Sequence, residues 1–380
     1  MMKIAILIGY MPNPRILRRT RLESTCGEVH MVCWDRGSNM TKPPEEDGFS
    51  FHRIRCAAES NPLKRLLPYY KFTKSANEIL DEIDPDIIHV QGLDMLRIAC
   101  KRKHQSKKSV HIIYEVADLH RLLVDKQKGF VRKAAQWYLK REDQRCCKEI
   151  DLLIVTSEMF VERYFDRLVP PQKTMYFPNV PDSTVFQHFQ KKKEPHAFTV
   201  GFIGDVRYKT QMKNLLQAAQ RCNMPVLFAG IEKDGNEIEQ LCRFYKNATW
   251  YGRYDYASEI ADLYERCDVV FSVYDADMEN VRVALPNKLY EAIYCELPII
   301  VARGTYLSEL VTKWGVGVSV KHDDVDELAD ALIRLRDDKD YYQHLCQRCH
   351  ENKEIVNLER YNEMLLNRIK AMQSGIGQNL

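Results

Sequence analysis

The sequence predicts an α/β protein with two doubly wound domains, in which helices cover both faces of each parallel sheet. The chain has 380 residues, which is too long for one ordinary hydrophobic core and favours two domains. Short apolar segments alternate with helical segments, an order typical of parallel sheets. The alternation restarts after a polar, lysine-rich segment at 187–195. We therefore expect one domain at 1–190, a second at 191–356 and a final helical segment at 357–380.

In the first half, apolar runs predict strands at 3–8, 29–34, 51–55, 86–92, 110–114 and 151–155. Helices are expected at 15–23, 62–80, 93–103 and 121–148. The helix at 15–23 has a basic face, and the segment at 121–148 is basic along its length. The helix at 62–80 mixes leucines and a tyrosine with lysines and an arginine, so it could lie on a membrane surface. A half-buried helix with a solvated basic side is the alternative.

In the second half, strands are predicted at 198–204, 225–229, 249–251, 268–273, 298–302 and 317–320. Helices are expected at 211–222, 234–245, 256–266, 305–314 and 323–337, and 340–371 is expected to be mainly helical. The segment at 274–280 is expected to be a polar loop. Polar residues follow several of these strands, and open α/β sheets bind ligands at that edge.

The segment at 285–292, Leu-Pro-Asn-Lys-Leu-Tyr-Glu-Ala, organises the candidate site. Pro286 suits the first turn of a helix, where its missing N–H removes no hydrogen bond. Such a helix start attracts anions through its free N–H groups and its dipole, and Lys288 adds a full charge. Glu291 lies about one turn after Asn287 and Lys288, so all three can face one cleft. The pattern predicts a nucleotide site, with Lys288 near a diphosphate and Glu291 near a ribose, but an ordinary helix start with surface Lys and Glu remains the alternative.

Two cations bracket the loop that follows the strand at 198–204. Arg207 and Lys213 lie on either side of this loop, which begins after Gly204. They could hold the two phosphates of a nucleotide diphosphate, whereas the alternative is a plain strand-to-helix turn. Because this loop and the segment at 285–292 each follow their own strand of one predicted sheet, together they indicate a phosphate site more strongly than either does alone.

Further along the second domain, Gly252 and Tyr254 follow the strand at 249–251. Their backbone could contact a base, although an ordinary turn explains them equally well. Asn280 precedes the segment at 285–292 and could reach a sugar hydroxyl.

In the first domain, polar residues end two predicted strands. Asp118 and His120 follow the strand at 110–114, and His89 and Gln91 end the strand at 86–92. They could meet a sugar or the acceptor, and Asp118 or His120 could take part in catalysis. A structural Asp or His with satisfied hydrogen bonds is an equally good interpretation.

Several functional classes are disfavoured. No apolar run reaches the roughly 18 residues of a membrane span, and the N-terminal pattern lacks the features of a signal peptide. The twelve cysteines are scattered through apolar segments, which fits a reducing cytoplasm, and no His/Cys set indicates zinc. The glycine pattern of NAD-binding domains, the P-loop lysine motif and the nucleophile elbow do not occur.

Charge is unevenly distributed. Residues 1–190 carry 31 basic and 24 acidic side chains, whereas residues 191–380 carry 25 and 29. The excess is largest at 101–150, with 14 basic and 6 acidic side chains. A basic first domain could meet an anionic lipid, a phosphorylated acceptor or nucleic acid. Since no RNA-binding signature accompanies the charge, we expect no nucleic-acid partner.

From Asn280 to Ala302 the sequence is similar to the "N…PNKLYEA…PII" signature of bacterial capsule and O-antigen sugar transferases. Further matching segments are at 3–18, 86–89, 114–119, 151–157, 178–181, 204–215 and 252–274. Nearly end to end, the chain resembles the retaining glycosyltransferases of family 4. The resemblance implies the GT-B fold: two facing Rossmann-like domains with a cleft between them, and a final helix that returns to the first domain.

The resemblance also implies transfer of a sugar from a nucleotide-diphosphate sugar with retention at the anomeric carbon, without a metal ion or another cofactor. UDP is the expected nucleotide because it is the commonest in such families. The family's diphosphate-binding Arg and Lys fall on Arg207 and Lys213, and its ribose-binding Glu falls on Glu291. The expected donor-binding residues are Gly9, Gly204, Arg207, Lys213, Gly252, Tyr254, Asn280, Asn287, Lys288, Leu289 and Glu291.

Three positions depart from the family pattern. Asp205 stands where an Arg usually follows the glycine, Val283 replaces the first of two glutamates, and Ala117 replaces a histidine. The Asp-Leu pair at 118–119 is kept, as in some O-antigen relatives. Arg207 is therefore assigned by its spacing from Lys213, and Asn280 or Glu279 could contact the sugar in place of the missing glutamate. The replacement at 117 concerns the catalytic loop and not the donor site.

The expected mechanism uses no protein nucleophile. Arg207, Lys213, Lys288 and the helix start at Asn287 stabilise the departing diphosphate, which is a large catalytic contribution. The acceptor is expected to be a glycan or an undecaprenyl-diphosphate-linked glycan. It would be met on the side of His89, Gln91 and Asp118, by an enzyme in the cytoplasm or bound peripherally to the inner face of the membrane.

Three competing interpretations remain from the sequence. A non-catalytic sugar-nucleotide-binding partner of a transferase complex would explain the missing glutamate at 283. A GT-B nucleotide-sugar 2-epimerase or a phosphorylase would share the fold. An epimerase needs titratable groups around the sugar, and the predicted cleft offers few. A nucleic-acid-binding protein would use the basic region at 101–148.

Overall fold

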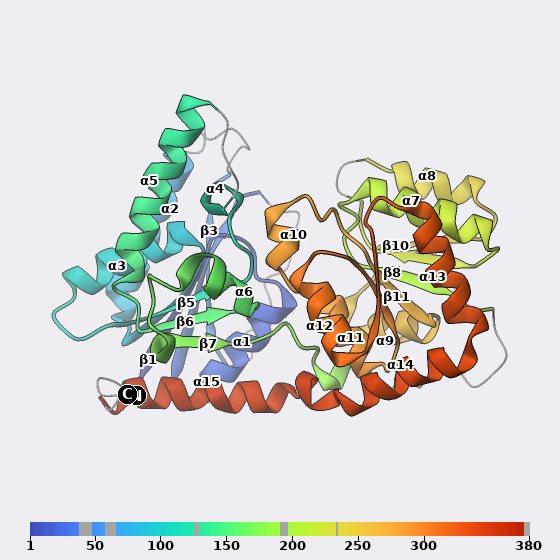
Figure 1. Ribbon diagram of the computed structural model, residues 1–380. Helices are drawn as coiled ribbons and strands as arrows, with labels where there is room; N and C mark the ends of the chain where they lie inside the picture. The colour runs from blue at the N-terminus through green and yellow to red at the C-terminus, as the bar shows by residue number, and fades with distance from the viewer. Residues whose placement is uncertain (38–47, 58–65, 125–128, 191–196, 233–234, 376–380) are drawn as a thin grey trace. The chain divides into compact units, whose positions relative to one another are not determined.

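The computed structural model describes residues 1–37, 48–57, 66–124, 129–190, 197–232 and 235–375 (Figure 1). The chain divides into two compact units. Unit 1 comprises Met1–Pro178 with Glu359–Leu380, and unit 2 comprises Asn179–Leu358. Residues 179–190, which the sequence assigned to the first domain, thus lie in unit 2, and the predicted linker falls partly outside the described residues.

Unit 1 is built on seven parallel strands in the order β3-β2-β1-β4-β5-β6-β7. The strands are β1 (Lys3–Ile8), β2 (Glu28–Asp35), β3 (Ser50–Arg55), β4 (Ile87–Gln91), β5 (His111–Val116), β6 (Leu152–Val155) and β7 (Thr174–Tyr176). The buried runs of β1, β4 and β6 fit strands that are covered on both faces. The order reverses between β1 and β4, so the loops after these two strands border a crevice of the kind that binds ligands.

The helices of unit 1 are α1 (Pro14–Ser24), α2 (Leu66–Ile83), α3 (Leu93–Gln105), α4 (Arg121–Val124), α5 (Phe130–Cys147), α6 (Glu158–Phe160) and α15 (Leu358–Gln373), and Val161–Phe165 forms a π-helical turn. The predicted start of α2 at Pro62 lies outside the described residues, as do residues 125–128 between α4 and α5. Asn13 caps α1, because its side chain accepts a hydrogen bond from the Ile16 N–H at 3.0 Å. Ser157 lies at the N-cap of α6, but without a side-chain capping bond.

Strand register determines which face of the unit 1 sheet is polar. Ile6 of β1 lies opposite His89 of β4, and Gln91 lies opposite Glu115 of β5. Since side chains alternate along a strand, His89, Gln91 and Glu115 share one face. The other face is apolar: Trp34 of β2 stacks on Phe72 of α2 with ring centroids 4.9 Å apart.

Unit 2 contains six parallel strands in the order β10-β9-β8-β11-β12-β13. They are β8 (Val200–Ile203), β9 (Val226–Ala229), β10 (Ala248–Gly252), β11 (Val269–Ser272), β12 (Ile299–Ala302) and β13 (Gly317–Val320). The helices are α7 (Lys209–Arg221), α8 (Glu237–Phe244), α9 (Tyr256–Glu265), α10 (Glu279–Val283), α11 (Asn287–Tyr294), α12 (Tyr306–Trp314), α13 (Val325–Asp337) and α14 (Lys339–Glu351). Two doubly wound parallel sheets confirm the predicted α/β fold class.

Two local predictions in unit 2 need correction. Pro286 is the N-cap of α11, one residue before the helix rather than in its first turn. The expected polar loop at 274–280 includes the start of α10, a five-residue helix that the sequence analysis missed. A helix this short has little periodic signal, so its apolar residues do not reveal it.

Candidate functional site

The carboxyl edge of the unit 2 sheet brings three glycine turns together. The Gly204 N–H donates to the Ala229 carbonyl at 2.7 Å, and the Gly230 N–H donates to the Gly252 carbonyl at 2.7 Å. Gly230 has φ +145°, and a Cβ there would lie 2.0 Å from the Gly204 oxygen. Only glycine fits this close approach. The loops after β8, β9 and β10 are therefore fixed side by side.

Lys288 lies over the first of these turns. Its Nζ donates to the Tyr274 hydroxyl at 3.1 Å and lies 4.5 Å from the centroid of the Phe202 ring. A Cβ on Gly204 would come within 2.7 Å of this Nζ. The side chain is 8% exposed. The structure thus holds an ammonium group at the switch point of the sheet, between β8 and β11, as an anion site requires.

Helix α11 adds a second source of positive potential at this edge. It begins at the exposed Asn287, and Pro286 at its N-cap provides no side-chain capping bond. The Leu289 N–H bonds to the Pro286 carbonyl at 3.2 Å, and the Leu289 side chain lies fully in the core. Leu289 therefore offers a ligand backbone at most, whereas Asn287 offers a side chain at a positive helix end.

Glu291 lies one turn further into α11 and is almost enclosed. Its Oε1 accepts from the Tyr256 hydroxyl at 2.9 Å, and its Oε2 accepts from the Tyr264 hydroxyl at 2.6 Å. Burial raises the pKa of this carboxyl, although the two tyrosines and Lys288 oppose the rise. Burial, followed by the charges of Glu291 and Asp205, raises the pKa of Tyr254. Tyr254 therefore neighbours both acids, and the structure groups it with Glu291 as predicted residues of one site.

The predicted phosphate ligands Arg207 and Lys213 have carboxylate partners. Arg207 is 61% exposed, and its Nη2 lies 3.2 Å from Asp205. The Lys213 Nζ lies 2.5 Å from Glu237, the first residue of α8. Each cation has further N–H donors besides those that face its carboxylate, and both side chains are partly exposed. Asn280 lies half-buried in the first turn of α10.

Asp275, Asp277 and His322 form a group that could hold a metal ion. One ligand atom from each lies within 4.8 Å of the others. Asp275 and Asp277 follow β11, and His322 follows β13. The His322 Nδ1 lies 3.7 Å from Asp275. The sequence analysis had not singled out these residues, because His322 is far along the chain from the two aspartates.

At the carboxyl edge of the unit 1 sheet, the loops after β1 and β5 meet. The Tyr10 hydroxyl donates to Gln91 Oε1. Burial raises the pKa of Tyr10, Arg15 opposes the rise, and Glu115 and Asp118 add to it, so Asp118 neighbours the tyrosine. Gly9 precedes Tyr10, and a Cβ there would lie 3.1 Å from Arg36 Nη2. Asp118 and His120 are both exposed in the loop after β5.

His89, an expected acceptor contact, instead lies in a buried charge network. Its Nδ1 is 2.6 Å from Glu23 of α1, and its Nε2 is 3.3 Å from Glu115. Glu115 also lies 3.4 Å from Arg19 and 3.5 Å from Arg15. With 1% of its surface exposed, His89 does not reach solvent. In this structure it holds neighbouring residues in place.

The network shifts the pKa values of its members. Burial lowers the pKa of His89, but Glu23 and Glu115 outweigh burial and raise it to about 9. Burial likewise opposes ionisation of Glu115, but Arg19, Arg15 and His89 hold its pKa well below the usual range. His89 is therefore protonated near neutral pH. The network thus places His89, Arg15 and Arg19 around the carboxyl groups of Glu23 and Glu115.

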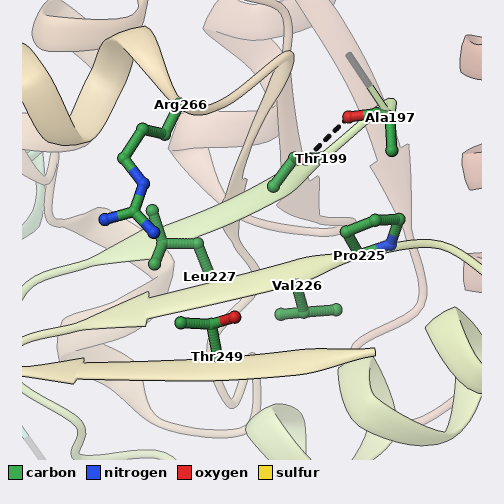
Figure 2. Close-up of a pocket in the computed structure, with 7 residues that line it drawn as sticks. All are labelled: Ala197, Thr199, Pro225, Val226, Leu227, Thr249 and Arg266. Carbon is green, nitrogen blue, oxygen red and sulfur yellow. Dashed lines mark hydrogen bonds between the residues drawn. The ribbon is translucent and has the colours of Figure 1, made fainter. Parts of the chain in front are cut away.

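A pocket of about 290 Å³ lies at the opposite edge of unit 2 (Figure 2). It is lined by Ala197, Thr199, Pro225, Val226, Leu227, Thr249 and Arg266. Most of these residues precede or begin β8, β9 and β10. Ligands of doubly wound sheets bind at the carboxyl ends of the strands, so this pocket is separate from the candidate site. No helix within the described parts of the chain has the length and hydropathy of a membrane span.

Comparisons with known proteins agree with the two-domain fold. Residues 20–180 match the protein family described as "Glycosyl transferase 4-like domain". Residues 184–355 match the family described as "Glycosyl transferases group 1". The succinoglycan biosynthesis protein ExoL of Rhizobium meliloti is 24% identical over 349 residues, which cover 87% of this chain and 84% of ExoL.

Two solved structures resemble the fold over nearly the whole chain. The sucrose-phosphate synthase of Thermosynechococcus elongatus has a TM-score of 0.75 at 16% identity, covering 99% of this chain and 100% of that one. Anabaena HepE in complex with UDP and glucose has a TM-score of 0.71 at 15% identity, covering 98% of this chain and 100% of that one.

The fold and the matched domains define a glycosyltransferase. This chain belongs to the GT-B glycosyltransferases of the family 4 type. The expected family, fold and enzyme class are confirmed.

Sequence reasoning missed two sets of neighbours. The hydroxyl partners of Glu291, Tyr256 and Tyr264, are eight residues apart on α9 and so lie on one face of that helix. The α1 members of the buried network follow the same logic, because Arg15 and Arg19, which contact Glu115, and Glu23, which contacts His89, recur every four residues. These spacings were visible in the sequence, but the elements that pack against them were not.

Proposed function

We propose that this enzyme transfers a sugar, with retention and without a metal ion, from a nucleotide-diphosphate sugar to a glycan or to a polyprenyl-diphosphate-linked glycan. The proposed donor is a UDP-sugar. The observation that carries the proposal is the Lys288 ammonium fixed over the Gly204 turn, beside the start of α11. A cation and a helix N-terminus at a switch point suit a diphosphate.

The proposed roles follow from positions in the site. Lys288 and the first turn of α11 counter the charge that develops on the departing diphosphate. Arg207 and Lys213 join them through their remaining N–H donors. Glu291 accepts hydrogen bonds from ribose hydroxyls.

The bond between the anomeric carbon and the β-phosphate oxygen breaks, and the acceptor oxygen bonds to that carbon on the same face. The acceptor proton passes to the departing phosphate oxygen. No protein nucleophile takes part. Gln91 and Asp118 at the edge of unit 1 are the proposed acceptor contacts, and Asp118 or His120 assists there.

Two comparisons support the finer parts of the proposal. HepE, a structural neighbour, was solved with UDP and glucose. ExoL is described as a succinoglycan biosynthesis protein, which supports a role in bacterial surface polysaccharide synthesis. We propose that the reaction takes place at the cytoplasmic face of the membrane that carries the acceptor.

Calorimetric titration of the full chain with UDP, GDP, CDP and ADP tests the donor site. We expect one diphosphate to bind selectively, with or without EDTA, and Lys288→Met to weaken its binding. Lys246→Met is the matched control, since Lys246 is an exposed lysine of the same unit outside the site. A folded protein that binds none of the four would overturn the donor-site assignment.

Activity needs a second measurement. Incubation with a UDP-sugar and a lipid extract, followed by mass spectrometry, should detect a glycosylated lipid and free UDP. If the anomeric configuration of the new bond is opposite to that of the donor, the retaining mechanism is wrong.

A further inference from the structure

Two helices of unit 1 expose an unusual amount of apolar surface. Thirteen large hydrophobic side chains are exposed among the described residues, and seven of them lie on α2 and α5. The seven are Leu66, Leu67, Tyr70, Phe130, Val131, Trp137 and Tyr138. Isolated exposed hydrophobics need no explanation, but a group confined to two helices indicates an interaction surface.

The first half of α5 is exposed around its whole circumference. From Phe130 to Tyr138 only Gln136 is partly covered, and the rest are exposed. Phe130 is 87% and Trp137 is 62% exposed. Because they are seven residues apart, they lie on one stripe of the helix, beside Val131 and Tyr138 on the next. Nothing within the described residues covers this stripe.

The start of α3 joins the two helices into one surface. The Tyr69 hydroxyl of α2 donates to the Asp94 carbonyl at 3.4 Å. One turn along α3, Arg97 Nη2 donates to the Tyr138 hydroxyl of α5 at 3.2 Å. Figure 1 shows α2, α3 and α5 together in unit 1. The exposed leucines of α2 and the aromatic residues of α5 therefore belong to neighbouring parts of the same unit.

The basic residues of α2 and α5 indicate what binds to this surface. Residues 129–141 contain Arg132, Lys133, Lys140 and Arg141 and no acidic residue, and residues 66–77 contain Lys71 and Lys74 and no acidic residue. Tryptophan and tyrosine among leucine, phenylalanine and basic residues match the boundary of an anionic bilayer, where rings and aliphatic groups enter the headgroup region and cations meet phosphates. A protein partner would need an apolar groove lined with acids around a helix that is exposed on all sides.

We propose that the first half of α5 and the start of α2 form a docking surface for an anionic lipid bilayer. The inference names the surface through which the proposed membrane-held acceptor is reached, and it rests on that part of the proposed function. Because the surface lies on unit 1 and the donor residues lie on unit 2, vesicle binding and nucleotide binding are measured independently. Failure of one does not imply failure of the other.

Flotation of the full chain with vesicles tests the surface. We expect binding to phosphatidylcholine–phosphatidylglycerol vesicles, weaker binding to phosphatidylcholine alone, and loss of binding as salt screens the charges. Each basic residue at a membrane surface contributes about fivefold to binding. Lys133→Gln should therefore reduce the partition coefficient about fivefold, while Lys246→Gln in unit 2 should leave it unchanged.

The contribution of the apolar side chains to vesicle binding can be tested with a matched control variant. Phe130→Ser should reduce vesicle binding about tenfold or more, because a ring that enters the bilayer is lost. Phe244→Ser removes an equally exposed ring, at 80%, from unit 2 and should have no effect. Both side chains are exposed, so neither change should disturb folding, and circular dichroism checks this. Trp137 fluorescence should shift to the blue on vesicle binding, and Trp137→Gln should remove that shift.

Three outcomes would overturn the proposal. The wild-type chain could stay unbound at low salt, or Phe130→Ser and Phe244→Ser could act equally. The third is concentration-dependent self-association of the chain, seen by sedimentation, that Phe130→Ser abolishes while vesicle binding is unchanged. That result would assign the surface to a second copy of the chain.

Discussion

Replacing His89 by glutamine tests whether the buried charge network stabilises unit 1, and the structure predicts the sign of its pH dependence. The imidazole lies between Glu23 and Glu115, and these two carboxylates raise its pKa to about 9. In the unfolded chain a histidine has its ordinary value of about 6.5. Because the folded value is the higher one, the protonated imidazole stabilises the folded state fully below pH 6.5. This contribution disappears as the pH rises through about 9.

The magnitude follows from the two pKa values. Each pH unit between them corresponds to about 1.4 kcal/mol, so the difference between 6.5 and about 9 gives about 3 kcal/mol. His89 is fully buried, so solvent does not screen the interaction. The low pKa of Glu115 reports partly the same interaction and is not counted again. A loss of about 3 kcal/mol is a large fraction of the stability of an ordinary domain.

The assay must read unit 1 apart from unit 2, since a chain with two units need not unfold in one step. Pulsed hydrogen exchange after equilibration in urea does this, because exchange in the peptide that contains β4 reports the unfolding of unit 1. We expect the free energy of unfolding of the wild type minus that of His89→Gln to fall by about 3 kcal/mol between about pH 6.5 and 9.5. Lysines, thiols and tyrosines titrate in both proteins, so the difference isolates His89. Equal pH slopes, or an imidazole NMR titration of His89 near 6.5, would refute the reasoning.

The other predictions concern unit 2. Lys288→Met should weaken UDP binding about tenfold to a hundredfold, because a hydrogen bond to a charged phosphate is lost; an unchanged dissociation constant would remove Lys288 from the site. Tyr256→Phe should tighten UDP binding about fivefold, because the half-buried Tyr256 hydroxyl occupies the Glu291 oxygen that a ribose would need. Weaker binding of UDP would instead show that Tyr256 contacts the ligand. Asp275→Asn and EDTA should each leave transfer from a UDP-sugar unchanged, and a loss that Mn²⁺ restores would show that the group with His322 holds a required metal.

The segment around α11 shows what a sequence reveals about a site. A proline, a lysine and a glutamate at helical spacing predicted a helix start with two functional side chains, and α11 begins within one residue of that prediction. The predicted partners of Glu291 were ribose hydroxyls, whereas in the structure tyrosine hydroxyls occupy both oxygens. Which face of α9 packs against α11 depends on the tertiary fold, and no local pattern encodes it.

Arg207 and Lys213 show a different limit. Their spacing around a glycine turn indicated phosphate ligands, but it could not show that Glu237 lies beside Lys213. Asp205 is two residues from Arg207, so that pair was visible. Glu237 comes from α8, one crossover further along the chain, and its approach to Lys213 depends on how α7 and α8 pack.

The two units differ in how they arrange charged side chains at the carboxyl edges of their parallel sheets. In unit 2, the Lys288 ammonium lies against the Phe202 ring and the Tyr274 hydroxyl, and its charge opposes the rise in the pKa of the buried Glu291. In unit 1, the cations contact Glu115, which would remain buried and uncompensated without them. Arg15 is the partly exposed member of that network and lies beside Tyr10. Loss of the His89 proton therefore leaves Glu115 dependent on Arg19 and Arg15. We expect this change to reach Tyr10, which lies beside Arg15 and bonds to Gln91 at the end of β4.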